Sequence, residues 1–444
     1  MSDLWTNLAI SGISNIINNR NINRTIRETY EGNESRKNIS NLGSVYIEGL
    51  MSYAIQQNHK YGSYVVSGGT NTLRVRTAAA IAKVGLMEEF PVIILHEGNG
   101  ELFDRVVDYT NDMAEQRARV DISGGTENYD PFYNRSSDEI FHLIVDSMGN
   151  DARIGYSAKR YVDAMIDFVS MTDIYPYCDS LLACPHDDMV DKINDMSRNG
   201  YISDNEASAL INKIMQGQNE RYNIEEFFSR FSYQSKGKIA YDHNSSNVCN
   251  IKDIIMANGL ALVDVGSSTN DIFINIIMNE INEMISSGYE MMLILDNINI
   301  KSNSLISRIA TSNSGRCRTT LVSEDVYSTM LNANDDLFRS FVGNATNCVV
   351  YTHNRGVSSE KWSEAIGRYE EYKVSQNVGN SYNYGIFGGG GIQNSVNLSS
   401  QMEYIVKPEE IRGMPCDMAY ILDKGLGLAS ARIVRLDSIR ALPQ

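Results

Sequence analysis

The chain has 444 residues, of which 42% are hydrophobic and 21% are charged, so it can form two or three domains and is not broadly disordered. Its formal net charge of −16 opposes general adhesion to DNA or anionic lipid, but it is compatible with a local basic channel. No apolar run approaches the ~20 residues that a membrane-spanning helix needs, and the six cysteines form no CxxC pair. We therefore expect a cytoplasmic protein with reduced thiols that only partners recruit to the inner face of a membrane.

Residues 1–44 predict a helix followed by a polar arm. Apolar residues recur at roughly helical spacing from Leu4 to Ile17. The basic residues that follow are interrupted by Glu28, Glu31 and Glu34. This mixture indicates a solvated arm rather than a phosphate-binding segment.

Residues 45–110 predict one βαβ unit. A strand at Tyr64–Ser67 is followed by a glycine turn and a helix, and a second strand at Pro91–Leu95 ends in His96–Asn99. The crossover should be right-handed. The pair Gly68-Gly69 fits either an ordinary strand-to-helix turn or a nucleotide-binding loop, and the sequence leaves both open.

Residues 111–234 predict an all-helical, acidic insertion. Within it, Asp195–Glu206 resembles a twelve-residue calcium loop, with oxygen-bearing residues at several ligand positions and Gly200 at the turn. The same residues also fit a helix terminator followed by a capping box that begins at Ser203. A zinc site is not expected at Cys178, Cys184 and His186, because their spacing fits no standard pattern.

Strands resume in residues 235–444 and alternate with helices. They are expected at Leu260–Val265, Met291–Asn297, Thr319–Ser323 and Asn347–Tyr351. This alternation predicts an α/β domain with a parallel central sheet covered on both faces. A flexible loop is expected around the glycine run Gly388–Gly391.

Asp296 ends the apolar run of one of these strands, MMLILD. A carboxylate delivered to the edge of a parallel sheet can hold Mg²⁺, or it can cap the following helix. Arg316 and Arg318 precede the next strand and fit either structural ion pairs or a phosphate contact across a subunit interface. Glu324 follows that strand.

In order and spacing, these segments resemble the motor domain of type IV secretion and conjugation coupling proteins, the TraG/TraD-like branch of the HerA/FtsK P-loop superfamily. The resemblance is carried by Ser67–Thr77, Met291–Asn297, Ser307–Asp325 and Tyr404–Pro415. It implies a RecA-like P-loop NTPase domain with an all-α insertion domain, ATP and Mg²⁺ as cofactors, and assembly into an oligomer. It also implies that Asp296 binds the metal and that Asp296, Arg316, Arg318 and Glu324 form the catalytic set.

The motifs of the family are degenerate in this chain. The turn that would bind nucleotide comprises Gly68, Gly69, Thr70, Asn71, Thr72, Leu73, Arg74 and Val75. Arg74 stands where the family has the phosphate-binding Lys, and Val75 replaces the hydroxyl that ligates Mg²⁺. Asn297 replaces the catalytic Glu, and Glu324 replaces the Gln of the sensor.

The resemblance and the substitutions together predict a coupling-type component of a conjugative DNA transfer or type IV secretion machine, with weak or absent ATP hydrolysis. Its partners would be the machinery proteins and other subunits, with DNA as one candidate cargo. Two alternatives stay open: an active ATP-driven DNA translocase, and a purely structural protein-docking adaptor.

Overall fold

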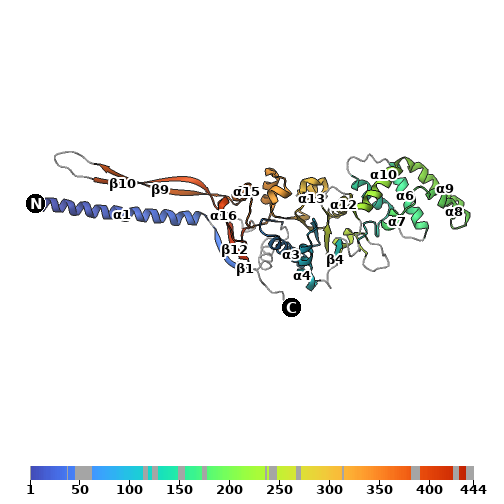
Figure 1. The fold of residues 1–444 in the computed structure, drawn as a ribbon, viewed down its shortest axis with the longest axis horizontal. Helices are drawn as coiled ribbons and strands as arrows, with labels where there is room; N and C mark the ends of the chain where they lie inside the picture. The colour runs from blue at the N-terminus through green and yellow to red at the C-terminus, as the bar shows by residue number, and fades with distance from the viewer. Residues whose placement is uncertain are drawn as a thin grey trace.

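The computed structural model describes residues 2–37, 39–45, 63–113, 119–122, 129–148, 156–172, 178–235, 238–239, 248–266, 272–312, 315–381, 391–423 and 430–436. The molecule is elongated, with an α/β body between a stalk at one end and a group of helices at the other (Figure 1). Among the described residues, no helix is both long enough and apolar enough to cross a membrane.

The body is built on a ten-stranded sheet in the order β1-β12-β11-β8-β2-β7-β6-β3-β5-β4, counted over the described residues. Neighbouring strands run parallel except where β11 pairs with β8 and with β12. The strands are β1 (Ser40–Val45), β2 (Tyr64–Ser67), β3 (Val92–His96), β4 (Arg119–Ile122), β5 (Leu260–Asp264), β6 (Met291–Asp296), β7 (Cys317–Ser323), β8 (Asn347–Val350), β11 (Met418–Asp423) and β12 (Ser430–Leu436).

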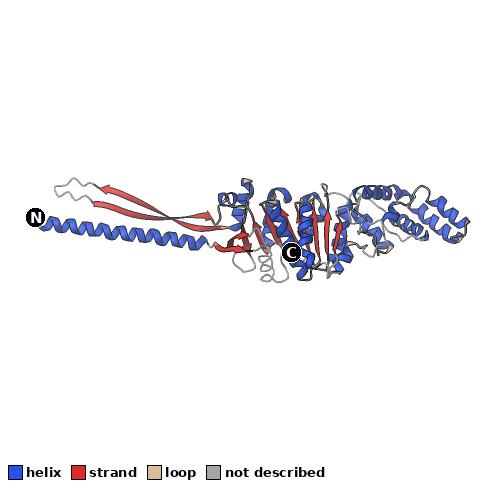
Figure 2. Cartoon of the chain, turned by 60° about the horizontal axis from the view of Figure 1, so that its bottom comes forward, coloured by secondary structure: helices blue, strands red, loops and turns tan. Residues whose placement is uncertain are grey.

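Both faces of the sheet are covered by helices, as Figure 2 shows. Every residue of β2, β3, β6 and β7 is buried, which explains the nearly continuous apolar runs in β2, β3 and β6. Successive side chains enter opposite cores: Ile93 packs with one face and Ile94 with the other. One core includes α3 (Asn71–Met87) and α4 (Gly100–Thr110); the other includes α11 (Ile251–Met256), α12 (Ile272–Ser286), α13 (Ser304–Ala310), α14 (Asp335–Asn344) and α15 (Gly356–Ile366).

The predicted α/β fold with a mostly parallel sheet is confirmed, but the predicted all-α span of 111–234 is wrong at its start. Residues Arg119–Ile122 form β4, which pairs with β5 at the edge of the sheet. Only Val120 and Ile122 are buried in this short strand, so its apolar signal is weak. The helices that follow are α5 (Ser137–Ser147), α6 (Tyr156–Met171), α7 (Cys178–Leu182), α8 (Met189–Arg198), α9 (Asp204–Gly217) and α10 (Arg221–Gln234).

The stalk consists of the helix α1 (Ser2–Lys37) and an antiparallel hairpin of β9 (Arg368–Ser381) and β10 (Gly391–Tyr404). The predicted polar arm is wrong, because the helix continues through it. Arg24 and Arg27 form ion pairs with Glu28 and Glu31 one turn later, at 2.8 and 2.7 Å, a spacing that supports a helix.

The glycine run, where a flexible loop is expected, comes between the two long strands of the hairpin. Gly391 begins β10, whereas Gly388–Gly390 lie outside the described residues. After β10, the short helix α16 (Pro408–Arg412) packs beside α15 and returns the chain to the body.

Candidate functional site

The glycine turn and Asp296 lie at the same edge of the sheet. In register, Ser67 at the end of β2 pairs with Ser323 of β7, and Asp296 at the end of β6 pairs with Val322. The chain therefore brings the carboxyl ends of β2, β7 and β6 side by side. From β2 the chain continues to β3 on one side of the sheet, whereas from β7 it continues to β8 on the other side. In α/β sheets, ligands bind where the connections change direction in this way.

The amide groups of Gly68 and Gly69 are bonded to residues at the ends of neighbouring strands. Gly68 and Gly69 have positive φ values of 90° and 70°. The N–H of Gly68 donates to the carbonyl of Ser323 at 3.0 Å, and that of Gly69 donates to Thr352 at 2.8 Å. A phosphate-binding loop needs such N–H groups to converge on the anion, so these two donors are consumed by neighbouring strand ends.

The side chain of Arg74 occupies the inside of the turn. Its Nη1 donates to the carbonyl oxygens of Gly69 at 2.7 Å and Gly68 at 3.4 Å. The residue is buried, and this burial lowers the pKa of the guanidinium, while the nearby Asp296 opposes the shift. The turn thus directs carbonyl oxygens at an internal cation. A phosphate-binding loop would instead direct N–H groups at a bound anion.

The remaining turn residues serve the start of α3. Thr70 is its N-cap, and its hydroxyl accepts a hydrogen bond from the Leu73 amide at 3.4 Å. Thr72 is exposed. Val75 is 1% exposed within the apolar core, so it offers no ligand to a metal.

Tyr351 and His353, which follow β8, pack against the two glycines of the turn. An added Cβ at Gly69 would lie 2.8 Å from the Cβ of Tyr351, and one at Gly68 would lie 2.7 Å from the ring of His353. His353 Nδ1 lies 2.8 Å from the Tyr351 carbonyl and must donate to it, so its Nε2 accepts from the Ser67 hydroxyl at 2.9 Å. The local sequence gives no signal for the role of His353, because its partner Ser67 is 286 residues away along the chain.

Asp296 is held by a neighbouring amide. Its Oδ2 accepts a hydrogen bond from Asn99 Nδ2 at 2.7 Å. Burial raises the pKa of Asp296 to about 6, and Asn99 and Arg74 act in the opposite direction. The alternative that Asp296 caps a helix is wrong, since Asn299 and Asn303 cap the elements that follow.

Asn99 belongs to the His96–Asn99 segment and connects it to Asp296 and the turn. Its side chain lies 3.4 Å from that of Asn71, whose Nδ2 donates to Glu101 at 2.8 Å. The Asn99 amide donates to His96 Nδ1 at 3.1 Å. Burial lowers the pKa of His96, so the ring is neutral at pH 7 and Asn99 is fixed at both its backbone and its side chain.

Of the other predicted catalytic residues, only Glu324 lies near this cluster within one chain. It is exposed directly after β7, and its charge raises the pKa of Arg74 against the effect of burial. Arg316 and Arg318 lie at the amino end of β7, the opposite edge of the sheet. Arg318 stacks its guanidinium 3.6 Å from the ring centroid of Phe90 and lies 3.5 Å from Glu290.

The residues present do not fit a triphosphate with Mg²⁺. The amides of Gly68 and Gly69 are bonded elsewhere, the inside of the turn holds a guanidinium, and Val75 has no oxygen. Asn297, at the position of the family's catalytic Glu, cannot act as a general base. Within the described residues, no group of three or more His, Cys, Asp or Glu side chains is arranged to hold a metal.

The calcium-like segment is a capped helix start. Ser203 and Glu206 form a reciprocal capping box at the start of α9, with the Ser203 amide donating to the Glu206 carboxylate at 2.8 Å. Asp195 lies inside α8 and pairs with Arg198 at 3.2 Å. The capping interpretation is therefore confirmed.

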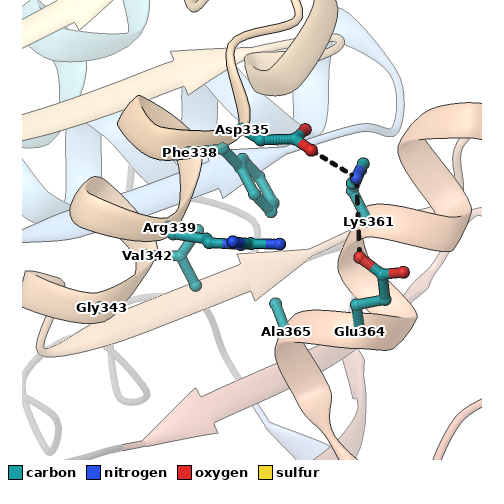
Figure 3. A pocket seen from close by; sticks show the side chains of 8 residues that line it. All are labelled: Asp335, Phe338, Arg339, Val342, Gly343, Lys361, Glu364 and Ala365. Carbon is teal, nitrogen blue, oxygen red and sulfur yellow. Dashed lines mark hydrogen bonds and ion pairs between the residues drawn. The ribbon is translucent and has the colours of Figure 1, made fainter.

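A cavity of about 340 Å³ lies elsewhere, between α14 and α15 (Figure 3). Phe338 and Val342 form its apolar wall. Lys361 crosses its rim and pairs with Asp335 at 2.9 Å and Glu364 at 3.6 Å. None of the predicted nucleotide-binding residues lines it.

No family model and no curated protein matches the chain. Among solved structures, it is similar to the unbound bacterial conjugative coupling protein TrwBdeltaN70, with 13% identity, 89% of this chain and 93% of that chain covered, and a TM-score of 0.51. Weaker similarities are to the plasmid coupling protein TrwB in complex with ADP and Mg²⁺ (13% identity, 88% of each chain, TM-score 0.48) and to VirB4 of Thermoanaerobacter pseudethanolicus (11%, 68% and 79%, TM-score 0.36). The predicted resemblance is thus confirmed for the fold: over almost its whole length the chain is similar to a conjugative coupling protein.

Proposed function

We propose that this protein is a coupling-type component of a conjugative DNA transfer or type IV secretion machine that does not hydrolyse ATP. Its RecA-like body serves as a scaffold for partner proteins. One observation carries the proposal: the turn that should cradle phosphates encloses Arg74, whose guanidinium bonds the carbonyls of Gly68 and Gly69. A nucleotide would have to displace this buried cation and break two backbone hydrogen bonds before the amides of Gly68 and Gly69 could bind it.

The role in a transfer machine is supported by the fold shared with TrwBdeltaN70 over 89% of the chain. Within this fold, the residues that the family's motifs supply for phosphate chemistry are replaced. We place the protein in the cytoplasm at the inner face of the membrane, held there by machinery proteins. The acidic helical end is the surface we assign to a basic partner or cargo.

A weakly active ATPase is the second candidate, because Asp296 still lies at the carboxyl edge near the turn. In that case Asp296 would hold Mg²⁺ through water, and Arg316 or Arg318 would act on the site of an adjacent subunit. DNA would then be the cargo.

Calorimetric titration with Mg·ATP, together with a phosphate-release assay, separates these functions. The scaffold proposal expects neither heat of binding nor phosphate release. Turnover that Asp296→Ala abolishes, while Asp264→Ala at the end of β5 leaves it intact, would overturn it. Asp264 is the matched control, because it ends β5 as Asp296 ends β6.

A DNA-binding titration over a range of salt concentrations tests the cargo. True phosphate contacts weaken steeply as salt rises. Weak binding that hardly responds to salt would support a protein cargo, whereas tight, salt-sensitive binding would support the translocase.

A further inference from the structure

The two edges of the stalk hairpin are protected very differently. The edge of β9 is covered by α1: the Asn33 side chain accepts from the Tyr372 amide at 3.0 Å and donates to its carbonyl at 2.8 Å. Arg36 lies 4.4 Å from the centroid of the Tyr372 ring. In both Figure 1 and Figure 2, α1 runs along one side of the hairpin only.

Within the part of the chain that the structure describes, the edge of β10 has no such cover. Tyr372 pairs with Ser400, and because Tyr372 turns its N–H and C=O toward α1, Ser400 turns its own away from β9. The same holds for every second residue of β10, including Leu398 and Met402. The hairpin sheet has only two strands among the described residues, so these backbone groups form an open edge.

The sequence of β10 carries none of the usual protection against pairing. Residues 391–402 contain no charged residue and no proline, whereas natural proteins guard exposed edges with both. Its partner strand carries the charged residues Arg368, Glu370, Glu371 and Lys373. Leu398 and Met402 lie on one face of β10 and are 56% and 60% exposed.

We infer that β10 pairs antiparallel with β10 of a second copy of this chain, which joins the two hairpins into a four-stranded sheet. The two-fold register within β10 that pairs every outward residue runs from Ile392 to Tyr404. It sets Leu398 opposite Leu398 of the second copy and Glu403 opposite Gln393. Charged side chains of like sign therefore never face each other, and the single charge meets an amide.

The assembly ends at two chains. A hairpin with two open edges would continue pairing into a fibre. Here α1 blocks the edge of β9, so each copy offers one edge, and an isologous contact with two-fold symmetry closes the assembly. A third and fourth strand also supply the stability that a two-stranded hairpin lacks in water.

Light scattering on the full-length protein tests the pairing. The expected mass is twice the 49.7 kDa of one chain. Ser400→Pro removes one outward N–H without touching the β9–β10 ladder, a position where edge strands accept proline, and should yield monomers. Ser400→Ala keeps the N–H and should remain dimeric. A wild-type monomer, or a dimer that Ser400→Pro leaves intact, would overturn the inference.

Cross-linking tests the register independently of whether the proline variant folds. In a Cys416→Ser background, which removes the exposed native thiol, Leu398→Cys should form an interchain disulfide on mild oxidation. Opposed residues in such a pair lie about 5.5 Å apart between Cα atoms, within disulfide reach. Met402→Cys should not cross-link, because it faces residue 394 of the second copy. Equal cross-linking of both variants, or of neither, would contradict the register.

Discussion

At the scale of single residues, the turn between β2 and α3 is shaped by what stands around two glycines. The backbone at Gly69 has a φ of 70°, and Tyr351 packs directly beneath it. The carbonyls that this conformation turns inward are the ones that Arg74 binds. The turn is therefore specified by packing and by an internal hydrogen-bond donor, with no need for an anion.

Gly69→Ala should destabilise the protein by about 2–4 kcal/mol, because it combines an unfavourable positive φ with a 2.8 Å clash against the Cβ of Tyr351. Urea denaturation measures this loss. Gly98→Ala is the matched control, since Gly98 also has a positive φ of 58° but nothing within 4 Å of an added Cβ. It should cost only about 1–2 kcal/mol; equal losses in the two variants would show that packing under Gly69 contributes nothing.

Asp296 should make stability depend on pH. Its folded pKa of about 6 lies above the usual value of 3.8, so the folded state favours the protonated acid. The stability present below about pH 4 is then lost as pH rises through 6, by up to about 3 kcal/mol at 1.36 kcal/mol per pKa unit. Asp296→Asn removes this dependence. Urea denaturation of both proteins from pH 4 to pH 8 should show the difference, and parallel curves would contradict it.

At the scale of elements, the sequence predicts the buried central strands well and the peripheral ones poorly. β3 and β6 are runs of apolar residues whose burial on both faces leaves no other interpretation. β4 has only two apolar residues. β9 and β10 are rich in polar residues, because they pack against α1 and against each other rather than in the core of the body. No local sequence pattern in the hairpin predicts this packing.

The candidate site was predictable to a similar extent. The chain order of strands was enough to place Gly68, Gly69 and Asp296 at one edge of the sheet. The closure of the turn by Tyr351 and His353 was not, because these contacts join residues almost 300 positions apart. The position of Arg74 inside the turn depends on rotamer and packing, which the sequence does not state.

Asn33 should hold α1 against β9 through its side-chain hydrogen bonds. Asn33→Ala removes two hydrogen bonds to the backbone of Tyr372, each worth about 1 kcal/mol. The Tyr372 amide should then exchange with deuterium at least about tenfold faster, since 1.4 kcal/mol corresponds to a factor of ten. Hydrogen exchange with mass spectrometry measures the rate, and Ser35→Ala, at an exposed position of the same helical turn, should leave it unchanged. An unaltered rate in Asn33→Ala would show that α1 does not guard this edge.

At the scale of the whole molecule, a buried ion pair ties the segment before α5 to the body. Arg135 and Glu280 have side chains 1% and 0% exposed and lie 3.0 Å apart. Arg135 also reaches Glu283 at 2.9 Å, and the Tyr129 hydroxyl donates to Glu280. Burial raises the pKa of Glu280 to about 7, against the opposing effect of Arg135.

Arg135→Met should cost about 3–5 kcal/mol at pH 8, because Glu280 loses its buried cation and must either stay ionised in the interior or take up a proton at that pH. The loss should shrink toward pH 6, where Glu280 takes up a proton. Replacing both residues, as Arg135→Met with Glu280→Leu, should recover most of the stability. Denaturant unfolding measures all three proteins. A single variant as stable as the double one would contradict the role of this pair, and Arg105→Met in an exposed pair should change stability by less than about 1 kcal/mol.

The stalk meets the body through three separate chain crossings: α1 leads toward β1, α15 into β9, and β10 into α16. A rod attached by one crossing can swivel about it, whereas three attachments fix its direction. The strands of the hairpin and the acidic helices at the other end are therefore held at a constant separation along the long axis (Figure 1). Two partners bound at these two ends would therefore be kept at a fixed distance from each other.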